Sequence, residues 1–156
     1  MYDWFPNSIT SIFFPVNESI WEHMKIIFSS TIIVSFIEYM WIKKTGLLYH
    51  NFWFYNIFFA FLSIPVYLII FVPVYNIIGE NFIFSISLML AVIIFVVLMI
   101  NYYKKKEIKD LTFISLSFLS LCYILFGYLT YYPVYNELFY DTLNNMYGIN
   151  TYLLRD

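Results

Sequence analysis

Four long apolar segments constrain this chain more than any other feature. They cover residues 23–42, 51–72, 82–102 and 111–130. As helices rising about 1.5 Å per residue, all four would cross the roughly 30 Å hydrocarbon core of a bilayer. Hydrophobic residues make up 62% of the chain and charged residues only 12%, too little polar surface for a water-soluble fold of this size. The pattern predicts an all-α integral membrane helical bundle with four transmembrane helices, forming a single membrane domain over residues 1–156.

The distribution of lysines predicts the orientation of these helices. Lys43 and Lys44 lie in the loop at 43–50, and Lys104, Lys105, Lys106 and Lys109 lie in the loop at 103–110. Both loops fall on one side of a four-span bundle, and the positive-inside rule makes that side cytoplasmic. We therefore expect a multi-pass protein of the cell membrane with both termini extracytoplasmic, including an outward-facing C-terminal tail at 131–156.

Charge and cysteine content exclude several classes of function. A net charge of −2 gives no basis for nucleic-acid binding. Cys122 is the single cysteine, so the chain cannot form an internal disulfide or a cysteine metal site. We expect the lipid bilayer to be the main partner, and a protein partner or a homo-oligomer stays open.

A polar motif precedes and enters the first apolar segment. Within it, Ser19-Ile20-Trp21-Glu22 is typical of a capping box, in which the Ser19 hydroxyl accepts from the Glu22 amide and the Glu22 carboxylate accepts from the Ser19 amide. Trp21 is expected at headgroup level as an interfacial anchor. Capping therefore gives a structural explanation for three residues of the motif.

Capping leaves other polar residues of the motif unexplained. Glu18, Glu22, Lys25 and Ser29 follow one another at spacings of four, three and four, which predicts a polar stripe on one helix face. Charged groups in a membrane helix are costly, so the stripe should face the bundle interior or water. Pairing of Glu22 with Lys25 would offset part of that cost.

These residues form the candidate functional cluster. Its members are Asp3, Asn17, Glu18, Trp21, Glu22, His23, Lys25 and Asp141. Glu18, Glu22 and His23 offer oxygen and nitrogen donors for a divalent metal, the one cofactor that the sequence suggests. Such a site needs further carboxylates from the acidic outer face, and Asp3, Glu80 and Asp141 are the candidates. His23 could alternatively relay protons near neutral pH.

Glu38 is a separate acidic residue near the other end of the first segment. We expect its side chain to extend toward Lys43 and Lys44 or toward His50, and a site at the inner face is the alternative.

The motif resembles the signature of an uncharacterised family of small multi-pass bacterial membrane proteins of Firmicute type. These carry N-E-S-x-W-E-H-x-K before I-E-Y, as at residues 17–25 and 37–39, and end in L-F-x-D and Y-G-I, as at 138–141 and 147–149. The resemblance covers nearly the whole chain and implies a domain of unknown function without an assigned activity. Relatives have a further helix upstream of the motif, so we expect that this chain lacks the family's first helix.

Three functions remain open at this point. The leading hypothesis is a non-enzymatic membrane protein, structural or interacting, with a polar cluster at its outer face. The main alternative is a metal-dependent or acid–base membrane enzyme using Glu18, Glu22 and His23, with Asp3 and Asp141 completing the site. A transporter or proton-coupled component using Glu18, Glu22, Lys25 and Glu38 is the third.

Overall fold

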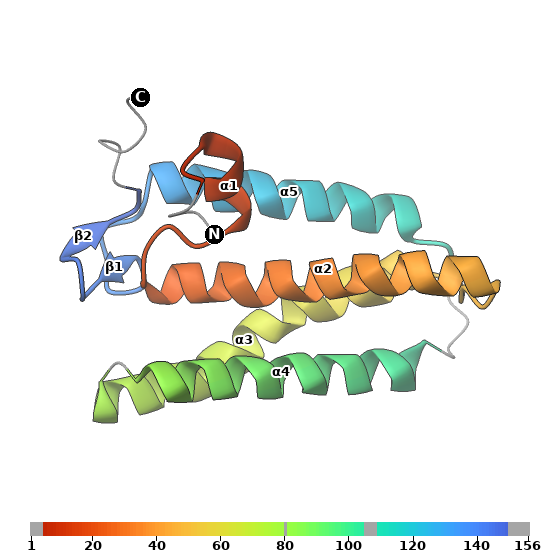
Figure 1. The fold of residues 1–156 in the computed structure, drawn as a ribbon, viewed down its shortest axis with the longest axis horizontal. Helices are drawn as coiled ribbons and strands as arrows, with labels where there is room; N and C mark the ends of the chain where they lie inside the picture. The colour runs from red at the N-terminus through yellow and green to blue at the C-terminus, as the bar shows by residue number, and fades with distance from the viewer. Residues whose placement is uncertain (1–4, 80, 105–108, 150–156) are drawn as a thin grey trace. The chain divides into compact units, whose positions relative to one another are not determined.

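The structure, a computed structural model, is mostly helical and describes residues 5–79, 81–104 and 109–149 (Figure 1). Its helices are α1 (Ser8–Phe13), α2 (Ile20–Thr45), α3 (Phe52–Ile78), α4 (Phe82–Tyr103) and α5 (Thr112–Tyr131). Strands β1 (Tyr140–Asp141) and β2 (Met146–Tyr147) pair antiparallel in a short hairpin. The described residues thus include four helices, α2 to α5, that are long and apolar enough to cross a membrane.

The chain divides into two compact units. The terminal unit comprises Met1–Ser29 and Ser117–Asp156, and the central unit comprises Ser30–Leu116. Helices α2 and α5 each contribute residues to both units. The motif at 17–25 belongs to the terminal unit, whereas Glu38 belongs to the central unit.

The central unit is built on the packing of α3 against α4. One buried cluster of this unit is formed by Tyr55 and Phe59 from α3 with Val96 and Ile100 from α4. On α4 the buried residues Val92, Val96 and Ile100 recur every four positions, which places them on one face of the helix. Helix α3 continues without a break through Pro65 and Pro73.

A single amide ties together the two lysine-containing loops of the central unit. The Asn51 carboxamide accepts from the backbone N–H of Leu111 at 2.8 Å and donates to the backbone carbonyl of Lys109, also at 2.8 Å. Asn51 adopts a left-handed conformation with φ of 58°, immediately before α3 begins. These bonds place the chain before α3 and the chain before α5 at the same end of this unit.

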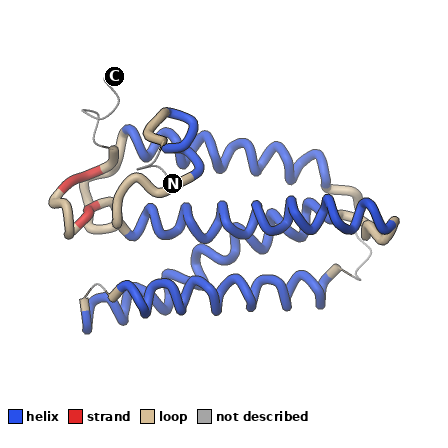
Figure 2. Tube along the Cα trace, in the orientation of Figure 1, coloured by secondary structure: helices blue, strands red, loops and turns tan. Residues whose placement is uncertain are grey.

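The terminal unit brings together segments from both ends of the chain. The short helix α1, the loop before α2, the last turns of α5 and the hairpin β1/β2 meet around the motif (Figure 2). Sequence reasoning predicted neither α1 nor the hairpin, because six-residue and two-residue elements carry almost no periodicity.

Candidate functional site

An ion pair lies at the centre of the terminal unit. The Lys25 Nζ is 2.6 Å from the Glu22 Oε2, one helical turn apart on α2. The two side chains are 0% and 1% exposed, so neither charge contacts solvent. The pairing expected from their spacing is therefore present. Ser29, one turn further along α2, is also buried, as the predicted interior-facing stripe requires.

The ammonium of Lys25 has an acceptor for each of its three protons. Besides the Glu22 carboxylate, it donates to the backbone carbonyl of Ser11 at 2.8 Å and to the Thr130 hydroxyl at 3.0 Å. An ammonium carries three donors and no acceptor, so this set satisfies it completely. A charge removed from water requires such compensation, since burying it unpaired is strongly unfavourable.

The short helix α1 supplies one of these acceptors for a local reason. In a continuing helix the Ser11 carbonyl would accept from the N–H of residue 15, but Pro15 has none. The carbonyl thus remains available to Lys25. Asn7 caps α1 by accepting from the amides of Ile9 and Thr10, and the Thr10 side chain accepts from the Asn7 amide. This capping box was not identified from the sequence and is revealed by the structure.

Helix α1 also packs closely on α5 within the terminal unit. The Ser11 hydroxyl lies 3.0 Å from the Tyr131 hydroxyl. A Cβ added to Gly127 would come within 3.2 Å of the Ile12 side chain, so the missing side chain at this position allows the close approach.

The capping box predicted for α2 is only half correct. The Ser19 hydroxyl does accept from the Glu22 amide, at 3.4 Å. The reciprocal bond is absent from the described residues, because the Ser19 amide donates to the Asn17 side chain at 3.0 Å instead. The Glu22 carboxylate turns inward, accepting from the Val16 amide at 3.2 Å and the Thr130 hydroxyl at 3.4 Å. In this position the Glu22 carboxylate neutralises the Lys25 ammonium instead of capping α2.

Asn17 and Trp21 connect the motif to the C-terminal hairpin. The Asn17 side chain donates to the Gly148 carbonyl at 2.9 Å, and the Trp21 amide donates to the Leu138 carbonyl at 2.9 Å. The Trp21 indole stacks on Phe139, with ring centroids 4.8 Å apart and planes inclined by 27°. Its role as an interfacial anchor stays a prediction. The two halves of the family-like signature, far apart in sequence, are thus in direct contact.

Glu18 departs from the predicted stripe. It precedes α2, which begins at Ile20, and its side chain is 53% exposed. Its carboxylate lies 3.5 Å from the Nε2 of His23, a residue that is itself buried. The stripe on the helix therefore starts at Glu22, because the chain before Ile20 does not follow helical spacing.

Asp141 organises the hairpin and attaches it to the motif. Its buried carboxylate accepts from the amides of Leu143 and Asn144, from the Asn144 side chain and, at 3.1 Å, from the Glu18 amide. Burial alone would raise the pKa of Asp141. The hydrogen bonds from Asn144, Glu18 and Leu143 outweigh that effect and hold the pKa below its usual value.

The geometry adds no support for a metal site. Within residues 5–79, 81–104 and 109–149, no group of three or more His, Cys, Asp or Glu side chains is placed to hold an ion. The oxygens of Glu22 and Asp141 already accept hydrogen bonds from protein groups. The candidate ligands Asp3 and Glu80 lie outside the described residues, so the metal hypothesis stays a prediction.

Three structural residues were missed by sequence reasoning. Ser11, Thr130 and Gly148 all contact the motif from distant positions in the chain. A lone serine, threonine or glycine in an apolar sequence carries no signal of such a contact. Gly148 lies within the Y-G-I sequence of the resemblance, but that resemblance gave no indication of its contact with Asn17.

Replacing Lys25 by Met is expected to destabilise the fold strongly. The substitution leaves the Glu22 carboxylate buried without its cation, which costs about 3–5 kcal/mol. The double variant Glu22→Gln/Lys25→Met should recover most of that loss, because both charges are gone. Chemical unfolding in neutral detergent measures both values, with the exposed Lys44→Met as a control expected to change stability by less than about 0.5 kcal/mol. A Lys25→Met cost equal to that of the control would contradict the ion pair.

The hydrogen bonds of Asp141 should make stability depend on acidity. Since its pKa is lowered in the folded state, its contribution is present above the unfolded pKa of about 3.9 and is lost as the pH falls through the folded value. Asp141→Asn should therefore be less stable than the wild type at pH 7, by about 1–3 kcal/mol. The two stabilities should converge below about pH 4. Unfolding measured across this range checks the prediction, and a difference that stays constant with pH would refute it.

The substitution Gly148→Ala should lower the free energy of unfolding more than the matched substitution Gly46→Ala. Gly148 and Gly46 have φ of 62° and 71°, so alanine is strained by about 1–2 kcal/mol at either. A Cβ at Gly148 would also lie 2.7 Å from the Thr130 carbonyl oxygen, whereas at Gly46 nothing lies within 4 Å. Chemical unfolding should give a lower free energy of unfolding for Gly148→Ala than for Gly46→Ala. Equal losses of stability would contradict the close contact between Gly148 and the Thr130 carbonyl of α5.

Comparison with known proteins leads to a family without an assigned activity. No curated protein and no solved structure matches the chain. The sequence profile of the Family of unknown function (DUF6512) matches residues 1–149. The matched range includes the motif, the buried ion pair and the hairpin that contacts Asn17, Glu18 and Trp21. Because it covers nearly the whole chain, the protein belongs to this family of unknown function.

Proposed function

We propose that this protein is a small multi-pass integral membrane protein whose helices α2 to α5 all cross the bilayer. Large apolar side chains are exposed on each of these helices, among them Ile37, Ile69, Ile83 and Phe113. In water such surfaces would drive aggregation, whereas acyl chains cover them without cost. Lipid is thus the proposed partner for this surface.

The proposed orientation follows from the lysines. Loops 43–50 and 103–110 face the cytoplasm, and the motif and the hairpin face outward. The hydrogen bonds from Asn51 to Lys109 and Leu111 support this arrangement, because they join the residue that follows loop 43–50 to the end of loop 103–110.

For the polar cluster we propose a structural role, in a protein that acts by interaction rather than by catalysis. One observation carries this proposal: all three protons of the buried Lys25 ammonium are accepted by protein groups. An acid–base or relay group needs a face open to substrate or water, and this pair has none among the described residues. The cluster instead fastens the motif, α1 and the end of α5 together.

Labelling of single cysteines tests the topology. In a Cys122→Ala background, Lys44→Cys and Glu137→Cys introduce thiols at exposed positions in a predicted inner loop and in the predicted outer tail. A membrane-impermeant maleimide added to intact cells should label the cysteine at 137 and leave that at 44 unlabelled.

Permeabilised cells provide the control. Both cysteines should then react, which shows that the one at 44 is accessible once the reagent can reach it. The reverse pattern in intact cells would overturn the orientation. Labelling of both without permeabilisation would overturn the four-span topology.

A further inference from the structure

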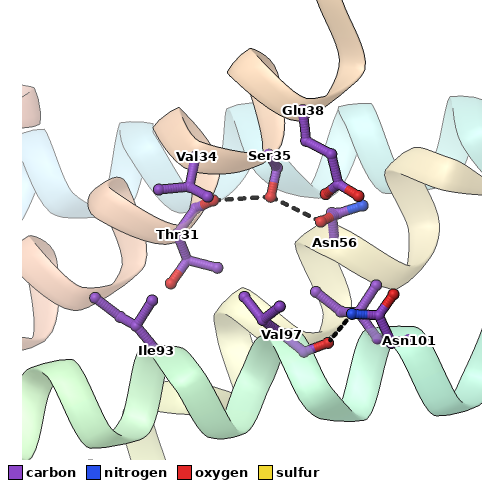
Figure 3. Close-up of a pocket in the computed structure, with 9 residues that line it drawn as sticks. Thr31, Val34, Ser35, Glu38, Asn56, Ile93, Val97 and Asn101 are labelled. Carbon is purple, nitrogen blue, oxygen red and sulfur yellow. Dashed lines mark hydrogen bonds between the residues drawn. The ribbon is translucent and has the colours of Figure 1, made fainter. Parts of the chain in front are cut away.

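A pocket in the central unit lies apart from the motif. It has a volume of about 180 Å³ and is lined by residues of α2, α3 and α4 (Figure 3). One part of its wall is aliphatic, formed by Val34, Ile93, Val97 and Ile100. The remainder is polar, formed by Thr31, Ser35, Glu38, Asn56 and Asn101.

Two of the polar side chains on this wall are hydrogen-bonded to each other and to the protein. The Ser35 hydroxyl lies 2.8 Å from the Asn56 Oδ1 and 2.8 Å from the Thr31 carbonyl oxygen. The Asn56 amide group donates to the Tyr49 hydroxyl at 3.0 Å and to the Phe52 carbonyl at 2.9 Å. The donors of Asn56 are therefore already used.

Asn101, on the opposite wall, is similarly engaged. Its amide group donates to the Val97 carbonyl at 3.0 Å, and its Oδ1 accepts from the Lys104 Nζ at 2.6 Å. The nearby cation is thus held by Asn101 and not by the carboxylate in the pocket.

Glu38 is the charged group of the pocket that does not take part in this hydrogen-bond network. Its half-buried carboxylate points into the pocket beside Asn56 (Figure 3). No described residue donates a hydrogen bond to it or forms an ion pair with it within 4.0 Å, although Lys104 interacts with it electrostatically. The expected extension toward Lys43 and Lys44 or toward His50 is not observed among the described residues. Glu38 forms no ion pair with any of them, Lys43 lies over the Tyr39 ring, and His50 contacts Asn51.

We propose that this pocket binds a small organic cation, with its ammonium group at the Glu38 carboxylate and its apolar body against the aliphatic wall. A carboxylate without a donor favours a cationic group, and the oxygens of Ser35 and Asn56 offer further acceptors. The aliphatic wall favours an apolar body, as in most small-molecule sites.

The size of the pocket and the chemistry of its wall further restrict the class of ligand that it could bind. An apolar cavity of about 150 Å³ holds benzene, so this pocket has room for about six to eight non-hydrogen atoms. Divalent metals prefer several oxygen ligands, commonly including more than one carboxylate, whereas Glu38 is the one carboxylate among the described residues that line the pocket. The geometry thus favours a compact amine over a metal ion.

Ligand-observed NMR titration of the full chain in lipid nanodiscs tests the proposal. Cyclohexylamine, which is protonated at neutral pH, is the probe, and cyclohexanol is its neutral match in size and shape. The amine should bind saturably, and the alcohol should bind at least about tenfold more weakly, because it lacks the charge-assisted bond to Glu38.

Three variants locate the binding. Glu38→Gln should weaken amine binding by at least about tenfold, and Val97→Phe, which fills the pocket without changing its charge, should abolish it. Glu18→Gln removes an exposed carboxylate from the terminal unit and should leave binding unchanged. Absence of saturable binding to the wild type, equal binding of alcohol and amine, or unchanged binding to Glu38→Gln would each overturn the proposal. Because this site does not involve the motif or the orientation of the chain, its failure leaves the proposed function unaffected.

Discussion

Burial of the Lys25 ammonium imposes the strictest requirement in the terminal unit. Three acceptors must surround it, and each comes from a different part of the chain: Glu22 from the same helix, the Ser11 carbonyl from α1 and the Thr130 hydroxyl from α5. Pro15 contributes by lacking the N–H that would otherwise occupy the Ser11 carbonyl. An unmet proton on this desolvated charge would be strongly unfavourable, so the burial of one ammonium constrains where α1 and the end of α5 can lie in this unit.

The hairpin extends this arrangement through the backbone. Asn17 reaches Gly148, Trp21 reaches Leu138, and Asp141 accepts from the Glu18 amide. All three bonds involve a backbone group, so they depend on how the chain turns as well as on side-chain identity. This explains why N-E-S-x-W-E-H-x-K and the sequence L-F-x-D with Y-G-I form one structural feature, although more than a hundred residues separate them.

Local sequence patterns predicted those parts of the structure that depend on interactions between residues close together in the chain. The four long helices follow from apolar length, and the Glu22–Lys25 pair follows from helical spacing. The other partners of Lys25 could not be predicted from the sequence, because Ser11 and Thr130 contact it only after the chain has folded. The same limit applies to Glu38, which was expected to extend toward Lys43, Lys44 or His50, whereas Lys43 lies over the Tyr39 ring and His50 contacts Asn51. The Glu22 carboxylate had two possible partners, the Ser19 amide in a capping box and the buried Lys25 ammonium. It pairs with the ammonium, and the Ser19 amide donates to Asn17 instead.

The composition of the two units has a consequence for the order of folding. The central unit is contiguous in sequence, so its helices can associate without any contribution from the terminal unit. The terminal unit joins the first residues to the last, and loop-closure entropy must be overcome before its contacts form. Lys25 precedes its acceptor Thr130 by 105 residues in the chain. Until α5 has been synthesised, the ammonium therefore has at most two of its three acceptors, and the terminal unit can form only after that helix exists.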